Sequence, residues 1–208
     1  GKPLTASIEA GFARKTQRLI CIGRFSGQQR HRAAQSNGEK DYESSGSMQQ
    51  IAVQLGDNSY DVRIEHGLLQ HSAAVLAPFA RGGRLLLVTD SNVAQHVAPD
   101  LLEGLKQAGV EAQVHILPAG EASKSWEQLA QLTEWLLANH VERSDHIIAL
   151  GGGVVGDITG FAAHIVKRGC HFVQVPTSLL AQVDSSVGGK TAINSGAGKN
   201  LVGAFHQP

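Results

Sequence analysis

From Met48 onward, apolar residues recur in short runs that polar or glycine-containing segments separate. Two alternating runs, 51–55 and 60–64, flank the turn at 56–58, and this arrangement predicts a β-hairpin. Longer apolar runs then alternate with segments of helical period, which is the pattern of buried parallel strands joined by helices. The strands are expected at 84–89, 112–117, 146–150 and 171–175, and the helices are expected to begin near Gly67 and to cover 92–109, 124–138 and 158–166.

This alternation predicts the α/β fold class: a Rossmann-like parallel sheet with helices on both faces, preceded by the β-hairpin. Asn92 and Ser123 are the expected N-caps of two helices, because short polar side chains accept hydrogen bonds from a first helical turn. Ligands of such sheets bind at the carboxyl ends of the strands. We therefore expect the polar segments that follow the strands to line one edge, namely 89–92, 118–121, 151–157 and 176–178.

The composition changes at Met48, the only methionine of the chain. The residues before it carry eight basic and four acidic side chains and show no sustained helical or strand period. We interpret residues 1–47 as a disordered leader or a non-native extension, and residues 48–208 as the α/β domain. A transit peptide is the alternative, which the acidic residues disfavour. An arm that binds nucleic acid is disfavoured because the basic residues are scattered.

The overall composition excludes several classes of protein. Lysine plus arginine equals aspartate plus glutamate at 18 each, so no net charge favours nucleic acid or a membrane surface as a partner. No apolar run approaches the roughly 18 residues of a membrane helix. The two cysteines are too few for a disulfide framework and fit a cytoplasmic location. The ten histidines lack the spacing of metal ligands, so no metal site is expected within this chain.

A glycine-rich segment, GGGVVGD at 151–157, follows a predicted strand and opens a helix. It contains G-x-G-x-x-G at Gly151, Gly153 and Gly156, where backbone N–H groups can approach a phosphate at the helix N-terminus. In a standard Rossmann unit this motif follows the first strand, and an acidic residue comes about 20 residues later. No acidic residue lies between Asp157 and Asp184. A tight turn without a ligand therefore remains the alternative.

A second segment, 174–191, combines hydroxyl groups, a carboxylate, glycines and a lysine. Its end resembles a P-loop, but Asp184 occupies the position that the motif reserves for a glycine, so we reject a nucleoside triphosphatase. Lys190, together with Lys199 and Asn200 further on, still suits a phosphate group. The segment therefore predicts an anionic, hydroxyl-bearing substrate, and a solvated polar loop is the alternative.

These motifs together resemble the 3-dehydroquinate synthase family. The strings that carry the resemblance are GGGVVGD at 151–157, GFAA at 160–163, RG at 168–169, QVPT at 174–177, LLAQVDSSVGGKT at 179–191 and GKNLVGAF at 198–205. The likeness covers Met48 to Pro208, and Ser178 departs from it because the family commonly has a second threonine there. The resemblance implies conversion of the sugar phosphate DAHP to 3-dehydroquinate in the shikimate pathway, with tightly held NAD.

In the family, transient oxidation of a hydroxyl by NAD allows phosphate to leave by β-elimination. Reduction and an intramolecular aldol reaction follow. The resemblance assigns substrate-side, catalytic roles to Arg168, Asp184, Lys190 and Asn200. It assigns cofactor contacts to Asp90, Asn92, Ala119, Gly120, Glu121, Ala122, Ser123, Lys124, Gly153, Val154, Val155, Gly156, Asp157, Thr177, Ser178, Lys190 and Lys199.

The family's divalent metal, zinc or cobalt, is held by a glutamate and two histidines of a helical C-terminal domain. We expect those ligands to lie outside this chain, and we expect the chain alone to be inactive. Within the superfamily, cyclases that make deoxy-inosose or valiolone are alternatives. Two further functions stay open, namely a glycerol-type, metal-dependent alcohol dehydrogenase and a nucleotide-binding module that scaffolds a partner. Related enzymes are commonly homodimers, which leaves a homodimer open for this chain.

Overall fold

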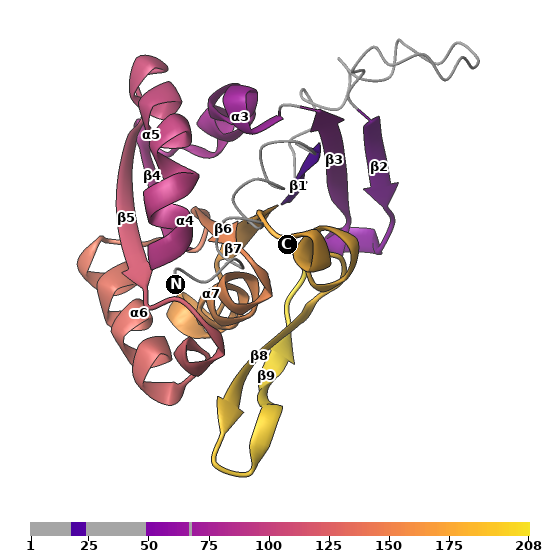
Figure 1. The fold of residues 1–208 in the computed structure, drawn as a ribbon, viewed down its shortest axis with the longest axis vertical. Coiled ribbons are helices and arrows are strands. Elements are labelled where there is room, and N and C mark those ends of the chain that lie inside the picture. Colours follow the sequence, from indigo (N-terminus) through magenta and orange to yellow (C-terminus); the bar gives the residue numbers. More distant parts are fainter. Residues whose placement is uncertain (1–17, 24–48, 67) are drawn as a thin grey trace, which may run out of the picture.

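A computed structural model describes residues 18–23, 49–66 and 68–208. One sheet has seven strands in the order β2-β3-β1-β7-β6-β4-β5, and β8 and β9 form a separate hairpin (Figure 1). The strands are β1 Arg18–Gly23, β2 Gln49–Val53, β3 Tyr60–His66, β4 Arg84–Asp90, β5 Glu111–Leu117, β6 His146–Gly151, β7 His171–Pro176, β8 Lys190–Ser195 and β9 Gly198–Phe205. The α-helices are α3 Leu68–Leu76, α4 Ser91–His96, α5 Ala98–Gln107, α6 Trp126–Ala138 and α7 Gly153–Ile165.

The half of the large sheet made by β7, β6, β4 and β5 is parallel throughout. Alternate residues of β4 point to opposite faces, so Leu86 and Val88 join one core with α6 and α7, while Leu85 and Leu87 join another with α3 and α5. Burial on both faces explains why these strands read as continuous apolar runs. The predicted Rossmann-like parallel sheet, with helices on both faces, is confirmed.

The other half of the sheet is antiparallel. β2 and β3 pair as the predicted hairpin, with Val53 opposite Tyr60. β1 lies between β3 and β7 and is antiparallel to both. This strand falls within the range 1–47, where no strand was expected; residues 1–17 and 24–47 lie outside the described residues. Among the described residues, no helix combines the length and the apolar character that crossing a membrane requires.

Three details of the helices differ from the predictions. The N-cap of α4 is Asp90 rather than Asn92, and the N-cap of α6 is Ser125 rather than Ser123. The expected helix 92–109 is two helices, α4 and α5, because the chain leaves helical geometry at Val97, before the proline of the next helix. Helix α7 begins at Gly153, five residues before its expected start, directly after the glycine-rich strand end.

The β8–β9 hairpin was not predicted, and it packs along α7 (Figure 1). Gly160 of α7 makes this contact possible, because a Cβ atom there would collide with the Thr191 methyl group and would lie 3.0 Å from Cζ of Phe172. Thr191 is buried and donates a hydrogen bond from its hydroxyl to the carbonyl oxygen of Ala204, 3.0 Å away. The hairpin is therefore held against the helix by close packing.

Gly160→Ala should therefore destabilise the chain although alanine favours helices. Overpacking costs about 1–3 kcal/mol, and the higher helix propensity of alanine returns roughly 1 kcal/mol, so we expect a net loss of up to about 2 kcal/mol in urea unfolding. Thr191→Ser removes the colliding methyl group and keeps the hydroxyl. Adding it to Gly160→Ala should recover part of the loss, and a double variant that is no more stable would contradict this account.

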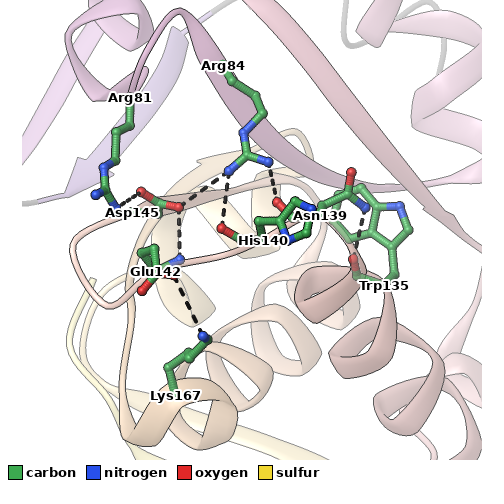
Figure 2. Close-up of polar contacts among 8 residues, drawn as sticks. All are labelled: Arg81, Arg84, Trp135, Asn139, His140, Glu142, Asp145 and Lys167. Carbon is green, nitrogen blue, oxygen red and sulfur yellow. Dashed lines mark hydrogen bonds and ion pairs between the residues drawn. The ribbon is translucent and has the colours of Figure 1, made fainter.

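Opposite the carboxyl ends of the strands, a polar network holds the loop between α6 and β6 (Figure 2). Asp145 Oδ1 lies 3.3 Å from Arg81 Nη1, and Asp145 Oδ2 lies 3.8 Å from Arg84 Nη2. Oδ2 also accepts a hydrogen bond of 3.0 Å from the backbone N–H of Glu142, whose own carboxylate pairs with Lys167 at 3.7 Å. This network joins the loop to the start of β4 and to the end of the α7 connection.

Candidate functional site

The ends of β4 and β5 lie together at the carboxyl edge of the parallel sheet. Asp90 ends β4, and its Oδ1 accepts hydrogen bonds from the backbone N–H groups of Asn92 (2.9 Å) and Val93 (3.0 Å). The hydroxyl of Ser91 accepts a hydrogen bond from the N–H of Ala119, at the end of β5, at 3.2 Å. Two of the segments expected at this edge, 89–92 and 118–121, are therefore joined by a hydrogen bond.

The glycine-rich end of β6 forms the start of α7. Its N-cap, Gly152, has no side chain to satisfy the first N–H groups of the helix. A Cβ atom on Gly153 would lie 2.9 Å from the Ser185 hydroxyl, so a larger residue there would force that hydroxyl to move. The N–H of Thr177, after β7, donates a 3.0 Å hydrogen bond to the carbonyl of Gly151. The predicted segments 153–157 and 177–178 are therefore neighbours.

A buried lysine connects these segments to the hairpin. The Lys124 side chain is 4% exposed, and its Nζ lies 2.5 Å from Oδ2 of Asp157 and 4.0 Å from Oε1 of Glu121. The same Nζ donates a hydrogen bond to the Oδ1 atom of Asn200, on β9. We call Glu121, Lys124, Asp157 and Asn200 the Lys124 cluster. It places one cation among two carboxylates and an amide, which come from separate parts of the chain.

Burial raises the pKa of the Asp157 carboxyl above its ordinary value, even though the hydrogen bond and positive charge of Lys124 act to lower it. The nearby Glu121 carboxylate adds to the increase. A carboxyl whose pKa is raised by folding favours the folded state while it is protonated, and this contribution is lost as the pH rises through the folded pKa. Ionisation of the Asp157 carboxyl therefore costs stability in the folded chain, and carboxyl groups with a shifted pKa are common at functional sites.

A residue that the sequence analysis did not identify, Asn194 of β8, connects the Lys124 cluster. Its Nδ2 donates a hydrogen bond to the Glu121 carboxylate (2.9 Å), and its Oδ1 accepts one from the Asn200 N–H (3.0 Å). Its backbone N–H donates to the carbonyl of Lys124 at 2.7 Å. The one local signal for the hairpin that carries it is the glycine-containing turn at 196–197, between β8 and β9.

Comparisons with known proteins agree with this architecture. Residues 114–208 match the family model described as 3-dehydroquinate synthase N-terminal. A 3-dehydroquinate synthase of Zymomonas mobilis is 57% identical over 158 residues, which are 76% of this chain and 42% of the relative. The chain is thus similar to the N-terminal part of 3-dehydroquinate synthases. It spans less than half the length of the curated relatives that it matches.

Solved cyclases share this fold. A 2-deoxy-scyllo-inosose synthase, complexed with carbaglucose-6-phosphate, NAD+ and Co2+, matches with a TM-score of 0.66 and 26% identity over 78% of this chain and 44% of that chain. A 2-epi-5-epi-valiolone synthase from Streptomyces hygroscopicus, with NAD+ and Zn2+ bound, has a TM-score of 0.57 and 32% identity over 59% of this chain and 34% of that chain. Both identities are well below 57%, so these two cyclases are more distant from this chain in sequence than the 3-dehydroquinate synthases are.

Several residues that the family resemblance assigned make no hydrogen bond or ion pair with the Lys124 cluster. The side chains of Asp184, Lys190 and Lys199 are exposed and make no hydrogen bond or ion pair within the described part of the chain. Because β6 and β7 are parallel, α7 runs back to the amino edge of the sheet, and Arg168 follows it there. Arg168, with φ of 63°, is thus at the edge opposite the Lys124 cluster.

Among the described residues, one pocket lies beside the Lys124 cluster and another lies away from it. A shallow pocket of about 390 Å³ borders the Lys124 cluster and is lined by Glu121, Lys124, Trp126, Asn194 and their neighbours. A second, of about 300 Å³, lies by the amino edge and includes Cys170. Burial raises the pKa of the Cys170 thiol to about 11, so no reactive thiolate forms there near neutral pH. In residues 18–23, 49–66 and 68–208, no group of three or more histidine, cysteine, aspartate or glutamate side chains could hold a metal ion.

Proposed function

We propose that this chain forms the NAD-binding portion of a 3-dehydroquinate synthase, a lyase that converts DAHP to 3-dehydroquinate with release of phosphate. The observation that carries the proposal is the contact of the buried Lys124 side chain with Asp157 and Asn200, next to the glycine-rich start of α7. This contact joins Lys124 and Asp157, which the family resemblance assigned to cofactor binding, with Asn200, which it assigned to the substrate side. The identity of 57% to a 3-dehydroquinate synthase supports this substrate over those of the related cyclases.

The residues at the carboxyl edge fit the chemistry of a dinucleotide. The first turn of α7 offers backbone N–H groups and the positive end of the helix dipole to a pyrophosphate, and Gly152 and Gly153 leave room for its approach. The carboxylate of Asp157 and the second oxygen of Asp90, which the helix cap leaves unused, are acceptors for ribose hydroxyl groups. When bound, NAD would supply the hydride acceptor for transient oxidation of the substrate.

The exposed lysines supply positive charge for the substrate side of the proposed site. Lys190 and Lys199 project from the hairpin without ion-pair partners among the described residues, so their charges are available to a phosphate or carboxylate group.

The proposed role of Arg168 fits a homodimer, because this residue is remote from the Lys124 cluster of its own chain. A second copy would have to present Arg168 to the site. We also propose a cytoplasmic location.

The described residues do not fit a divalent metal site, since they contain no suitable group of three ligands. Any zinc or cobalt ion of the proposed enzyme would therefore take its ligands from outside them. The residues of this chain would bind the dinucleotide, fix its orientation beside Lys124, and hold positive charge near a departing phosphate.

Calorimetric titration of the chain with NAD tests the proposed function. Wild type should bind, and Asp157→Ala should weaken binding at least about tenfold, the typical effect of losing a hydrogen bond to a charged group. Asp100→Ala, at an exposed aspartate of α5, is the matched control and should bind as wild type does. Absence of binding by wild type with its circular dichroism intact, or equal binding by Asp157→Ala, would contradict the assignment.

A further inference from the structure

Asn194 contacts two of the three partners of the buried lysine, Glu121 and Asn200, through one planar amide. Its Nδ2 donates to Oε1 of Glu121 at 2.9 Å and lies 3.5 Å from the carbonyl oxygen of the same residue. Its Oδ1 accepts from the N–H of Asn200 at 3.0 Å. Only an amide side chain offers a donor and an acceptor side by side in this way. Asn194 therefore joins the turn at 121–124 to the first residues of β9.

The contact with Asn200 has a further consequence. Asn200 has a φ of 58°, in the left-handed region that few residues other than glycine adopt at low cost. The hydrogen bond from its N–H to Asn194 holds this conformation, and in it the Asn200 Oδ1 atom accepts a hydrogen bond from Nζ of Lys124. The hydrogen bonds thus run from Lys124 to Asn200, from Asn200 to Asn194, and from Asn194 to Glu121, which pairs with Lys124 at 4.0 Å.

We propose that Asn194 is a positioning residue, which keeps Lys124 buried and fixes Glu121 and Asn200 around it. The inference rests on the proposed function in one respect, because the arrangement matters to the reaction only if the Lys124 cluster binds NAD. Asn194 itself would act through its neighbours. Removing its side chain would release the Glu121 carboxylate and the Asn200 backbone together, so Lys124 would lose its fixed surroundings on two sides.

Acylation of lysines by an amine-reactive reagent, followed residue by residue with mass spectrometry, tests this role without NAD. In wild type, Lys124 should react far more slowly than the exposed Lys190 and Lys199. Asn194→Ala should accelerate its reaction by about tenfold, the effect of losing one or two hydrogen bonds. Lys106, on α5, should react at its wild-type rate. An unchanged rate at Lys124 would overturn the proposal.

Asn194→Asp is measured beside the alanine variant, because it keeps the acceptor for the Asn200 N–H and loses the donor to Glu121. Its Lys124 rate should lie between those of wild type and Asn194→Ala. Circular dichroism would show whether the alanine variant folds. If it does not fold, the aspartate variant tests the proposal instead, and an unchanged acylation rate at Lys124 would overturn it. Asn139→Ala is the matched control: it removes an amide that donates a 2.9 Å hydrogen bond to the Trp135 carbonyl at the opposite edge of the sheet, and it should leave the Lys124 rate unchanged.

NAD affinity provides a second readout, which separates positioning from general stability. Asn194→Ala should weaken NAD binding by about tenfold when Lys124 is present. In a Lys124→Met background the same substitution should weaken NAD binding little further, because Asn194 affects NAD only by positioning Lys124. Equal losses in both backgrounds would overturn the positioning role. Failure of wild type to bind NAD would contradict the proposed function, while the acylation result would still decide the role of Asn194.

Discussion

Lys124→Met should lower the free energy of unfolding by about 3 kcal/mol, the lower end of the range for breaking a buried ion pair from one side. Methionine fills the space of the lysine stem, so the loss comes from charge and hydrogen bonding. Asp157 and Glu121 would face each other without a cation, and Asn200 would lose its donor. The lower end applies because the Asp157 side chain keeps 20% exposure. Urea unfolding at neutral pH measures the difference.

The pH dependence of this loss distinguishes charge from packing. Without Lys124, the two effects that lower the pKa of Asp157 disappear, so burial and Glu121 should raise that pKa further. As the pH falls through it, the carboxyl becomes protonated and the difference between Lys124→Met and wild type should shrink. Adding Asp157→Asn should likewise recover part of the loss at neutral pH. A constant difference across pH, with no recovery in the double variant, would show that packing alone is responsible.

The parallel strands could be predicted because burial on both faces requires runs of apolar residues, which can be recognised in the sequence. β4, β6 and β7 are buried on both faces, so most of their side chains are apolar, and residues 85–88 are a single run of such residues. Polar residues then appear where each strand leaves the core. The strand positions therefore also predicted which polar segments would meet at one edge.

The N-caps and the hairpin were harder to predict. Asp90 and Asn92 are both good caps and lie two residues apart, as do Ser123 and Ser125, so only the tertiary position of the strand end selects between them. In β9, Val202 and Ala204 pack against the core, yet Leu201 and Phe205 are exposed. Apolar residues on both faces remove the alternation that identifies a strand at the surface.

The family resemblance identified most residues of the site, but it did not predict the contacts between them. Lys124 meets Asp157 and Asn200 across 33 and 76 residues of sequence, and no local pattern specifies such contacts. Asn194 was missed because it belongs to no motif and acts through its neighbours. Conversely, Arg168 stands close to the motif residues in sequence, and the α7 crossover carries it to the opposite edge of the sheet.

At that opposite edge, Asp145→Ala should cost about 2–3 kcal/mol in urea unfolding, since it removes a buried carboxylate and leaves the Glu142 N–H without its acceptor. The Asp145 side chain is 8% exposed and contacts two arginines (Figure 2). Those arginines should not contribute equally. Arg81 is 58% exposed, so water screens its charge, whereas Arg84 is 31% exposed and also donates to the carbonyl oxygens of Asn139 and His140.

Arg81→Ala is therefore the matched control for Asp145→Ala, and it should cost less than about 1 kcal/mol, as surface ion pairs usually do. Arg84→Ala should cost more than Arg81→Ala, because it also leaves two loop carbonyl groups without donors. NAD titration of Asp145→Ala should match wild type, since the network lies at the edge away from the Lys124 cluster. Equal costs for the two arginines would mean that charge alone holds the loop, and that the backbone hydrogen bonds of Arg84 contribute nothing measurable.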